Sequence, residues 1–75
     1  MDNKEEARMD LFMKIIRGMD ILRSRDIPVE SVHLTEKMAN ILGEKSFYGA
    51  DVVIDDKCFV AAEERYENNI VNLNV

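Results

Sequence analysis

The sequence predicts an α+β fold with a long N-terminal helix, a short second helix and a small antiparallel sheet of three to four strands. Three observations lead to this class: a helical period over residues 5–25, a capped apolar segment over 36–42, and short β-type segments after residue 49. The chain has 75 residues with no repeat or linker, so we expect one domain covering 1–75.

The segment from Glu5 to Arg25 is the longest periodic stretch of the chain. At about 100° per residue, its apolar side chains cover about 240° of the helix, whereas an ordinary surface helix has an apolar stripe of roughly 100°. The first apolar stripe consists of Leu11, Ile15, Gly18 and Leu22. The second consists of Met9, Phe12, Met13, Ile16 and Met19. A narrow polar face carries Glu6, Asp10, Lys14 and Arg17.

Local signals mark both ends of this helix. Asp2 or Asn3 is the expected N-cap, and Pro28 disfavours helical backbone at the residue before it. Asp10 and Lys14 are spaced for an ion pair along one side of the helix. The helix is therefore expected to end shortly before Pro28.

The second helix is expected over residues 36–42, between the N-cap Thr35 and Gly43 just past its end. Before it, Val32 and Leu34 alternate with polar residues and predict a short strand. This helix has only about two turns, so its stability depends on tertiary packing.

A β-hairpin is expected at about 51–61, with strands 52–54 and 58–61 joined by a polar turn at 55–57. The segment 70–75 also alternates, with Val71, Leu73 and Val75 on one face. It is expected to form a last strand, either at an edge of the same sheet or as an arm that pairs with another chain.

The net charge of −5 is unevenly distributed along the chain. Residues 1–25 hold six basic and five acidic side chains, whereas residues 26–75 hold four basic and ten acidic ones. Such an acidic chain is not expected to bind nucleic acid directly, but it is suited to a basic protein surface. The acidic residues considered as a binding face are Asp51, Asp55, Asp56, Glu63, Glu64 and Glu67.

The single cysteine, Cys58, excludes an internal disulfide and favours a cytoplasmic location. No apolar run approaches the ~20 residues that span a bilayer, and the acidic N-terminal segment does not resemble a secretory signal, so we expect no membrane partner.

The chain lacks phosphate-binding, dinucleotide-binding, zinc-protease and CxxC motifs, so no cofactor or metal is expected. A nucleophile–base pair would need His33, the only histidine, beside Cys58, and nothing local brings them together. The acidic residues lack the spacing of a calcium-binding loop. We therefore interpret His33 as a strand residue and Cys58 as a small buried residue, and we expect no catalytic site.

The apolar arc of the long helix is the candidate interface. The second helix and the sheet are expected to cover only part of it, which leaves a face for a partner. The candidate interface residues are Leu11, Ile15, Gly18, Leu22, Met9, Phe12, Met13 and Met19. Either stripe could face the core. Gly18 would permit close approach of another backbone, and the methionines suit either irregular core packing or a partner surface.

The stretch VHLTEKMANILGEKSFYGADVVIDDKCFVAA, residues 32–62, resembles small uncharacterised proteins of bacteriophages and mobile elements. In those proteins a strand–helix unit leads to an aromatic-Gly-x-x-Val-Val hairpin. The resemblance implies a viral or prophage origin and, with the acidic charge, an inhibitor of host or defence proteins. It assigns no functional residue.

Three functions follow as hypotheses. The first is a non-enzymatic protein-interaction module that forms a homodimer through its N-terminal helix. The alternative is an acidic inhibitor that occupies a basic groove of a host nucleic-acid-processing or defence protein. An enzyme using Cys58 and His33 is a third and weaker hypothesis.

Overall fold

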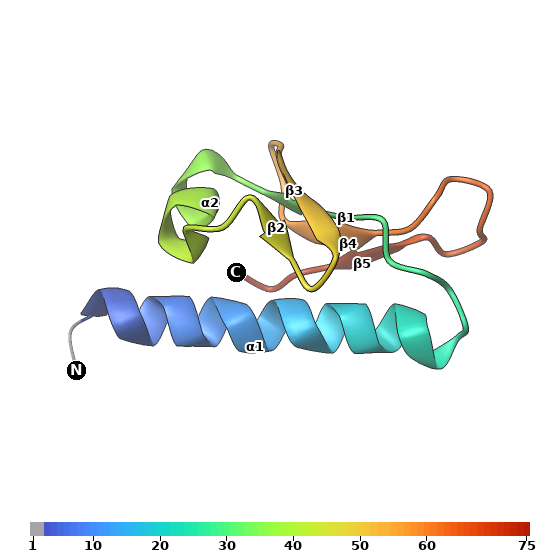
Figure 1. Ribbon diagram of the computed structural model, residues 1–75, viewed down its shortest axis with the longest axis horizontal. Helices are drawn as coiled ribbons and strands as arrows, with labels where there is room; N and C mark the ends of the chain where they lie inside the picture. Colours follow the sequence, from blue (N-terminus) through green and yellow to red (C-terminus); the bar gives the residue numbers. More distant parts are fainter. Residues whose placement is uncertain (1–2) are drawn as a thin grey trace.

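The structure, a computed structural model, describes residues 3–75 and confirms the α+β class (Figure 1). A long helix, α1 (Asn3–Ser24), is followed by strand β1 (Ser31–Leu34) and the short helix α2 (Glu36–Leu42). The strands β2 (Ser46–Phe47), β3 (Ala50–Ile54), β4 (Phe59–Ala61) and β5 (Ile70–Asn72) complete the chain. The sheet is therefore larger than the three to four strands expected.

The ends of both helices follow the local signals. α1 ends at Ser24, and the expected ion pair joins Lys14 Nζ to Asp10 Oδ2 at 2.9 Å. The Thr35 hydroxyl caps α2 by accepting a hydrogen bond from the backbone N–H of Met38, and Gly43 terminates it in a left-handed conformation (φ 70°). The N-cap expected at Asp2 lies outside the described residues.

The five strands form one mixed sheet in the order β2-β3-β1-β4-β5. β1 lies at the centre, parallel to β3 and antiparallel to β4. The purely antiparallel sheet was therefore a wrong prediction. The parallel pairing arises because α2 and β2 separate β1 from β3 in the chain, which gives the crossover that parallel neighbours require.

The hairpin expected at about 51–61 is also corrected. β3 and β4 do not pair with each other, because β1 lies between them. Four residues join the two strands, and they are long enough to cross the roughly 10 Å between strands that flank a common neighbour. The arrangement gives β1, whose Val32 and Leu34 are fully buried, a hydrogen-bonding partner on both edges. The consecutive strands that do pair antiparallel are β2 with β3 and β4 with β5.

The core lies between the helices and one face of the sheet. In Figure 1, α1 runs beneath both the sheet and α2, and α2 lies over the N-terminal half of the helix. Buried α1 side chains meet the inward residues of the strands, including Val32, Leu34 and Val60. The opposite face of the sheet, with exposed Asp51 and half-buried His33, has no helix over it.

Candidate functional site

The structure assigns the two stripes of the long helix to different roles. Leu11, Ile15, Gly18 and Leu22 are buried in the core, and so is Met19. These five residues were candidates for the interface, and that part of the expectation is corrected, because side chains enclosed by the chain's own sheet cannot contact a partner. The rest of the second stripe remains at the surface.

Gly18 permits a close approach within the chain itself. A Cβ atom at this position would lie 2.9 Å from Val60 Cγ2 and 3.1 Å from Leu73 Cδ2. Gly18 therefore makes room for side chains of the protein's own sheet region, Val60 of β4 and Leu73 directly after β5, and it lets α1 lie close to the sheet.

We call the surface part of the second stripe the outer stripe; it consists of Met9, Phe12, Met13 and Ile16. Met9 and Met13 are 58% and 49% exposed, and Phe12 and Ile16 are half-buried. A hollow of about 430 Å³ beside the stripe is lined by Glu5, Arg8, Met9 and Phe12. The outer stripe is thus an apolar surface with a recess at its N-terminal end.

An aromatic row extends the outer stripe toward the β2–β3 turn. The ring of Phe12 meets that of Phe47 edge to face at 5.0 Å, and Phe47 meets Tyr48 at 4.8 Å. Tyr48 is 68% exposed and has a positive φ of 50°. The Arg23 guanidinium donates to the Tyr48 carbonyl at 3.5 Å, so this turn lies close to the C-terminal half of α1.

The six candidate acidic residues do not form one face. Asp55 and Asp56 lie in the connection before β4, whereas Glu63, Glu64 and Glu67 follow the end of that strand. Asp51 pairs in register with Ser31, away from Asp55. Glu63 is also ion-paired with Arg65 at 2.7 Å. The sheet therefore separates the negative charge into two groups.

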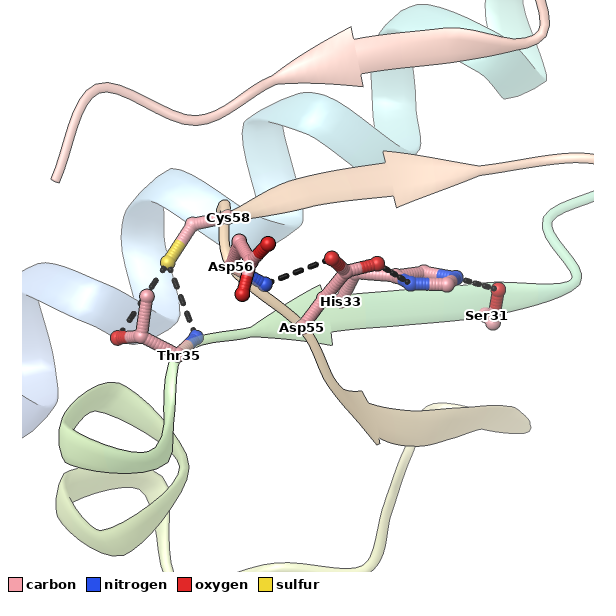
Figure 2. Close-up of polar contacts among 6 residues, drawn as sticks. All are labelled: Ser31, His33, Thr35, Asp55, Asp56 and Cys58. Atoms are coloured by element: carbon pink, nitrogen blue, oxygen red, sulfur yellow. Dashed lines mark hydrogen bonds and ion pairs between the residues drawn. The ribbon is translucent and has the colours of Figure 1, made fainter.

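Three polar residues on the open side of the sheet are linked in a row, as Figure 2 shows. Ser31 Oγ lies 2.9 Å from His33 Nε2, and His33 Nδ1 lies 3.0 Å from Asp55 Oδ2. Ser31 and His33 are two residues apart on β1 and so share a face, while Asp55 directly follows the neighbouring strand β3. The His33 ring stacks on Phe59 at 4.3 Å.

The row has the atom-to-atom connections of a Ser–His–Asp hydrolase triad. Catalysis also requires an accessible nucleophile and donors for an oxyanion. Ser31 is only 7% exposed, so its hydroxyl has little access to a substrate. The geometry therefore supports a structural role, in which the row ties β1 to the connection after β3.

Asp55 is held in its charged form. Its Oδ1 accepts a 2.6 Å hydrogen bond from the backbone N–H of Asp56, and this bond, followed by the one with His33, lowers the pKa of the Asp55 carboxyl below its usual value. Sequence reasoning missed this contact. The sequence contains a Ser-x-His pair within a predicted strand. This pair indicates the contact only when β3, which Asp55 follows, is known to be the neighbour of that strand.

Cys58 and His33 do not form a pair. Cys58 packs against the core on the inner face and lies 4.0 Å from Thr35 Oγ1, whereas His33 is on the outer face (Figure 2). The backbone N–H of Thr35 also donates to Cys58 Sγ at 3.5 Å. The thiol thus supports the start of α2, and a sheet separates it from the imidazole.

Two kinds of structural feature are absent from residues 3–75. Within that range, no three His, Cys, Asp or Glu side chains are grouped so that they could hold a metal ion. No helix there combines the length and apolar character needed to cross a membrane.

Comparison with protein-family models, with curated proteins and with solved structures found no match for this chain. The resemblance to phage and mobile-element proteins therefore stays a prediction. Any assignment of function has to be argued from the surface of the molecule.

Proposed function

We propose that this chain is a non-enzymatic protein-interaction module that self-associates through the outer stripe of α1. The observation that carries the proposal is the exposure of Met9 and Met13 beside half-buried Phe12 and Ile16. Their positions repeat at i, i+3, i+4 and i+7, which is the spacing with which a helix presents one apolar edge to a partner. The sheet and α2 leave Met9 and Met13 exposed and cover Phe12 and Ile16 only in part.

The small size of the chain also favours association with a second copy. Domains of this length bury a limited fraction of their surface and often depend on a second subunit or a cross-link for stability. Cys58 is the only cysteine, so an internal disulfide cannot supply this stability. Covering the outer stripe with a second copy would remove additional apolar surface from water.

The charges at the ends of the stripe favour a second copy in antiparallel orientation. Glu5 in the first turn of α1 and Arg23 in its last turn project on nearly the same side as Phe12 and Ile16. Antiparallel crossing places Phe12 opposite Ile16 of the second copy and Glu5 opposite its Arg23. Parallel crossing would place like charges together, which disfavours it.

The first test is the mass of the protein in solution at low micromolar concentration, measured by sedimentation. We expect the wild type to be a dimer and Met13→Glu to be a folded monomer, because a charge at the centre of the stripe would be buried by association. The matched control is Ile21→Glu, which changes an exposed apolar residue elsewhere on α1 and should leave the dimer intact. A well-folded monomeric wild type would refute the proposal.

The second test addresses the orientation. Glu5→Arg and Arg23→Glu should each weaken the dimer, because each creates like-charge contacts at both ends. Mixing the two variants should restore association, because one variant then supplies arginine and the other glutamate at each end of the dimer. If the mixture is as weak as the separate variants, the antiparallel arrangement is wrong, even where the wild type is a dimer.

The acidic-inhibitor alternative gains no support from the geometry. A mimic of nucleic-acid charge needs its carboxylates along one surface, and the candidate residues here lie in groups before and after β4. The open sheet face between those groups carries apolar Val53 and Ile70. We therefore favour the self-association module.

A further inference from the structure

The outer edge of β5 has backbone groups that point away from the sheet. Leu73 N–H donates to the Cys58 carbonyl at 3.0 Å, and Ala62 N–H donates to the Asn69 carbonyl at 2.8 Å. In an antiparallel ladder alternate residues bond to the same neighbour, so the odd-numbered residues of this segment face β4. The N–H and C=O groups of Ile70 and Asn72 therefore face the opposite side, where the sheet has no further strand among residues 3–75.

This edge is short, with three residues in β5, but it lacks two other features that usually prevent strand addition, charged residues and prolines. Natural edge strands carry charged residues, prolines or bulges that block pairing. The segment 68–75, NNIVNLNV, has no charged residue and no proline. The other edge of the sheet is β2, which has only two residues, Ser46–Phe47. The β5 edge is thus the more suitable of the two for an added strand.

A hollow of about 230 Å³ lies between this edge and α1. Its lining includes apolar Ile21, Val71 and Leu73 together with the basic side chains of Lys14 and Arg17. Ile21 is 40% exposed. Every second side chain of a strand added beside β5 would point toward this hollow. The hollow therefore selects for apolar side chains and for a negative charge.

Arg17 supplies the clearest preference for negative charge. Lys14 is already paired with Asp10, whereas Arg17 makes no ion pair or hydrogen bond with any residue in the described range 3–75. A carboxylate on an added strand would give Arg17 a partner that the chain itself does not provide.

We propose that the β5 edge binds an extended segment of another protein. In that segment, the residues whose side chains point toward the hollow are apolar or acidic, and they alternate with residues whose side chains point away from it. A second β5 edge fits less well, because residues 70–75 have no acidic side chain to meet Arg17. Leu73 lies over Gly18, so pairing two β5 edges about this point would also bring Lys14 and Arg17 of the two copies together.

The probe is an acetylated, amidated and fluorescent heptapeptide in which Val, Glu and Val alternate with Thr. Its matched control has Lys in place of Glu. Binding is measured by fluorescence anisotropy, and the contact residues are located by NMR shifts of backbone amides. We expect the Glu peptide to bind about fivefold more tightly than the Lys peptide, with the largest shifts at Ile70 and Asn72.

Three variants test the mechanism. Arg17→Glu should reverse the preference between the two peptides. Asn72→Pro should abolish binding, because it removes an outward N–H without breaking a bond to β4, and Asn72→Ala should retain binding. Met13→Glu should also retain binding, so the result is independent of self-association through the outer stripe.

Several results would overturn the proposal. They are equal binding of the two peptides, no binding at millimolar concentration, amide shifts confined to another surface, and equal binding by Asn72→Pro and Asn72→Ala. A wild-type dimer that Asn72→Pro dissociates, with neither peptide bound, would assign this edge to a second copy instead.

Discussion

At the scale of single residues, His33 and Asp55 show how strand pairing joins distant positions. The two residues are 22 positions apart, yet their side chains meet at 3.0 Å because Asp55 directly follows the parallel neighbour of β1. Ser31 and Phe59 hold the imidazole on its other sides. The row fixes the end of β3 against the central strand without burying an unpaired charge.

We predict that Asp55→Asn makes the stability of the fold less sensitive to acid. The Asp56 N–H and His33 lower the pKa of Asp55 in the folded protein, so its charged form stabilises the fold at pH above about 3.9, the unfolded value. This contribution is lost as the pH falls through the lower, folded pKa. Urea unfolding measured between pH 6 and pH 2 should show a smaller decline in the free energy of unfolding for Asp55→Asn than for the wild type.

The control for this prediction is Asp20→Asn. Asp20 is an exposed carboxylate with no hydrogen bond or ion pair to any residue from 3 to 75. Its variant should follow the acid dependence of the wild type. If the free energy of unfolding of Asp55→Asn declined with falling pH as much as that of the wild type, the Asp55 contacts would not contribute to stability.

At the scale of elements, α1 is held close to the sheet through Gly18. The absence of a side chain there lets Val60 of β4 and Leu73 after β5 reach the helix backbone. A glycine within a helix costs about 1 kcal/mol relative to alanine, so the close packing has to compensate for it. The rest of the contact is made by large apolar residues such as Leu11 and Ile15.

We predict that Gly18→Ala destabilises the protein by about 1 kcal/mol, although alanine favours helices. The new Cβ would approach Val60 Cγ2 to 2.9 Å, and the short valine side chain has little freedom to move away. Chemical denaturation gives the free energy of unfolding. In a Val60→Ala background the penalty should disappear, and a wild-type chain stabilised by Gly18→Ala would contradict the proposed close packing.

At the scale of the whole molecule, the fold has two layers and is elongated, with dimensions of 40 × 21 × 20 Å. α1 follows the long dimension and contacts the sheet on one side only (Figure 1). Within residues 3–75, this architecture leaves the open sheet face and the β5 edge without a covering element, and it covers the outer stripe only in part. Self-association would use the outer stripe, and strand addition would use the β5 edge.

We predict that the melting temperature of the wild type rises with protein concentration. A second copy that binds only the folded state stabilises it by mass action, whereas a monomer has a concentration-independent melting temperature. Calorimetry over a hundredfold range of concentration measures the effect, and Met13→Glu should abolish it. A wild-type melting temperature that stays constant over this range would argue against self-association.

The sequence by itself determined the elements with strong local signals. The long helix, the break before Pro28, the Thr35 cap and Gly43 all depend on residues within a few positions of one another. Alternation likewise indicated that Val71, Leu73 and Val75 lie on one face. Val71 and Leu73 are half-buried against the core, whereas Val75 is exposed. These interactions are local, so a single sequence is enough to identify them.

Only the tertiary structure decided which strands are neighbours and which side of α1 is buried. Both stripes of α1 are apolar enough for the core. Which stripe is buried depends on the position of a sheet whose strands extend from Ser31 to Asn72. The turn at 55–57 suits a hairpin as well as a crossing over β1, and the choice follows from burying Val32 and Leu34 at the centre. Contacts of this kind combine the free energies of distant segments, which local periodicity does not encode.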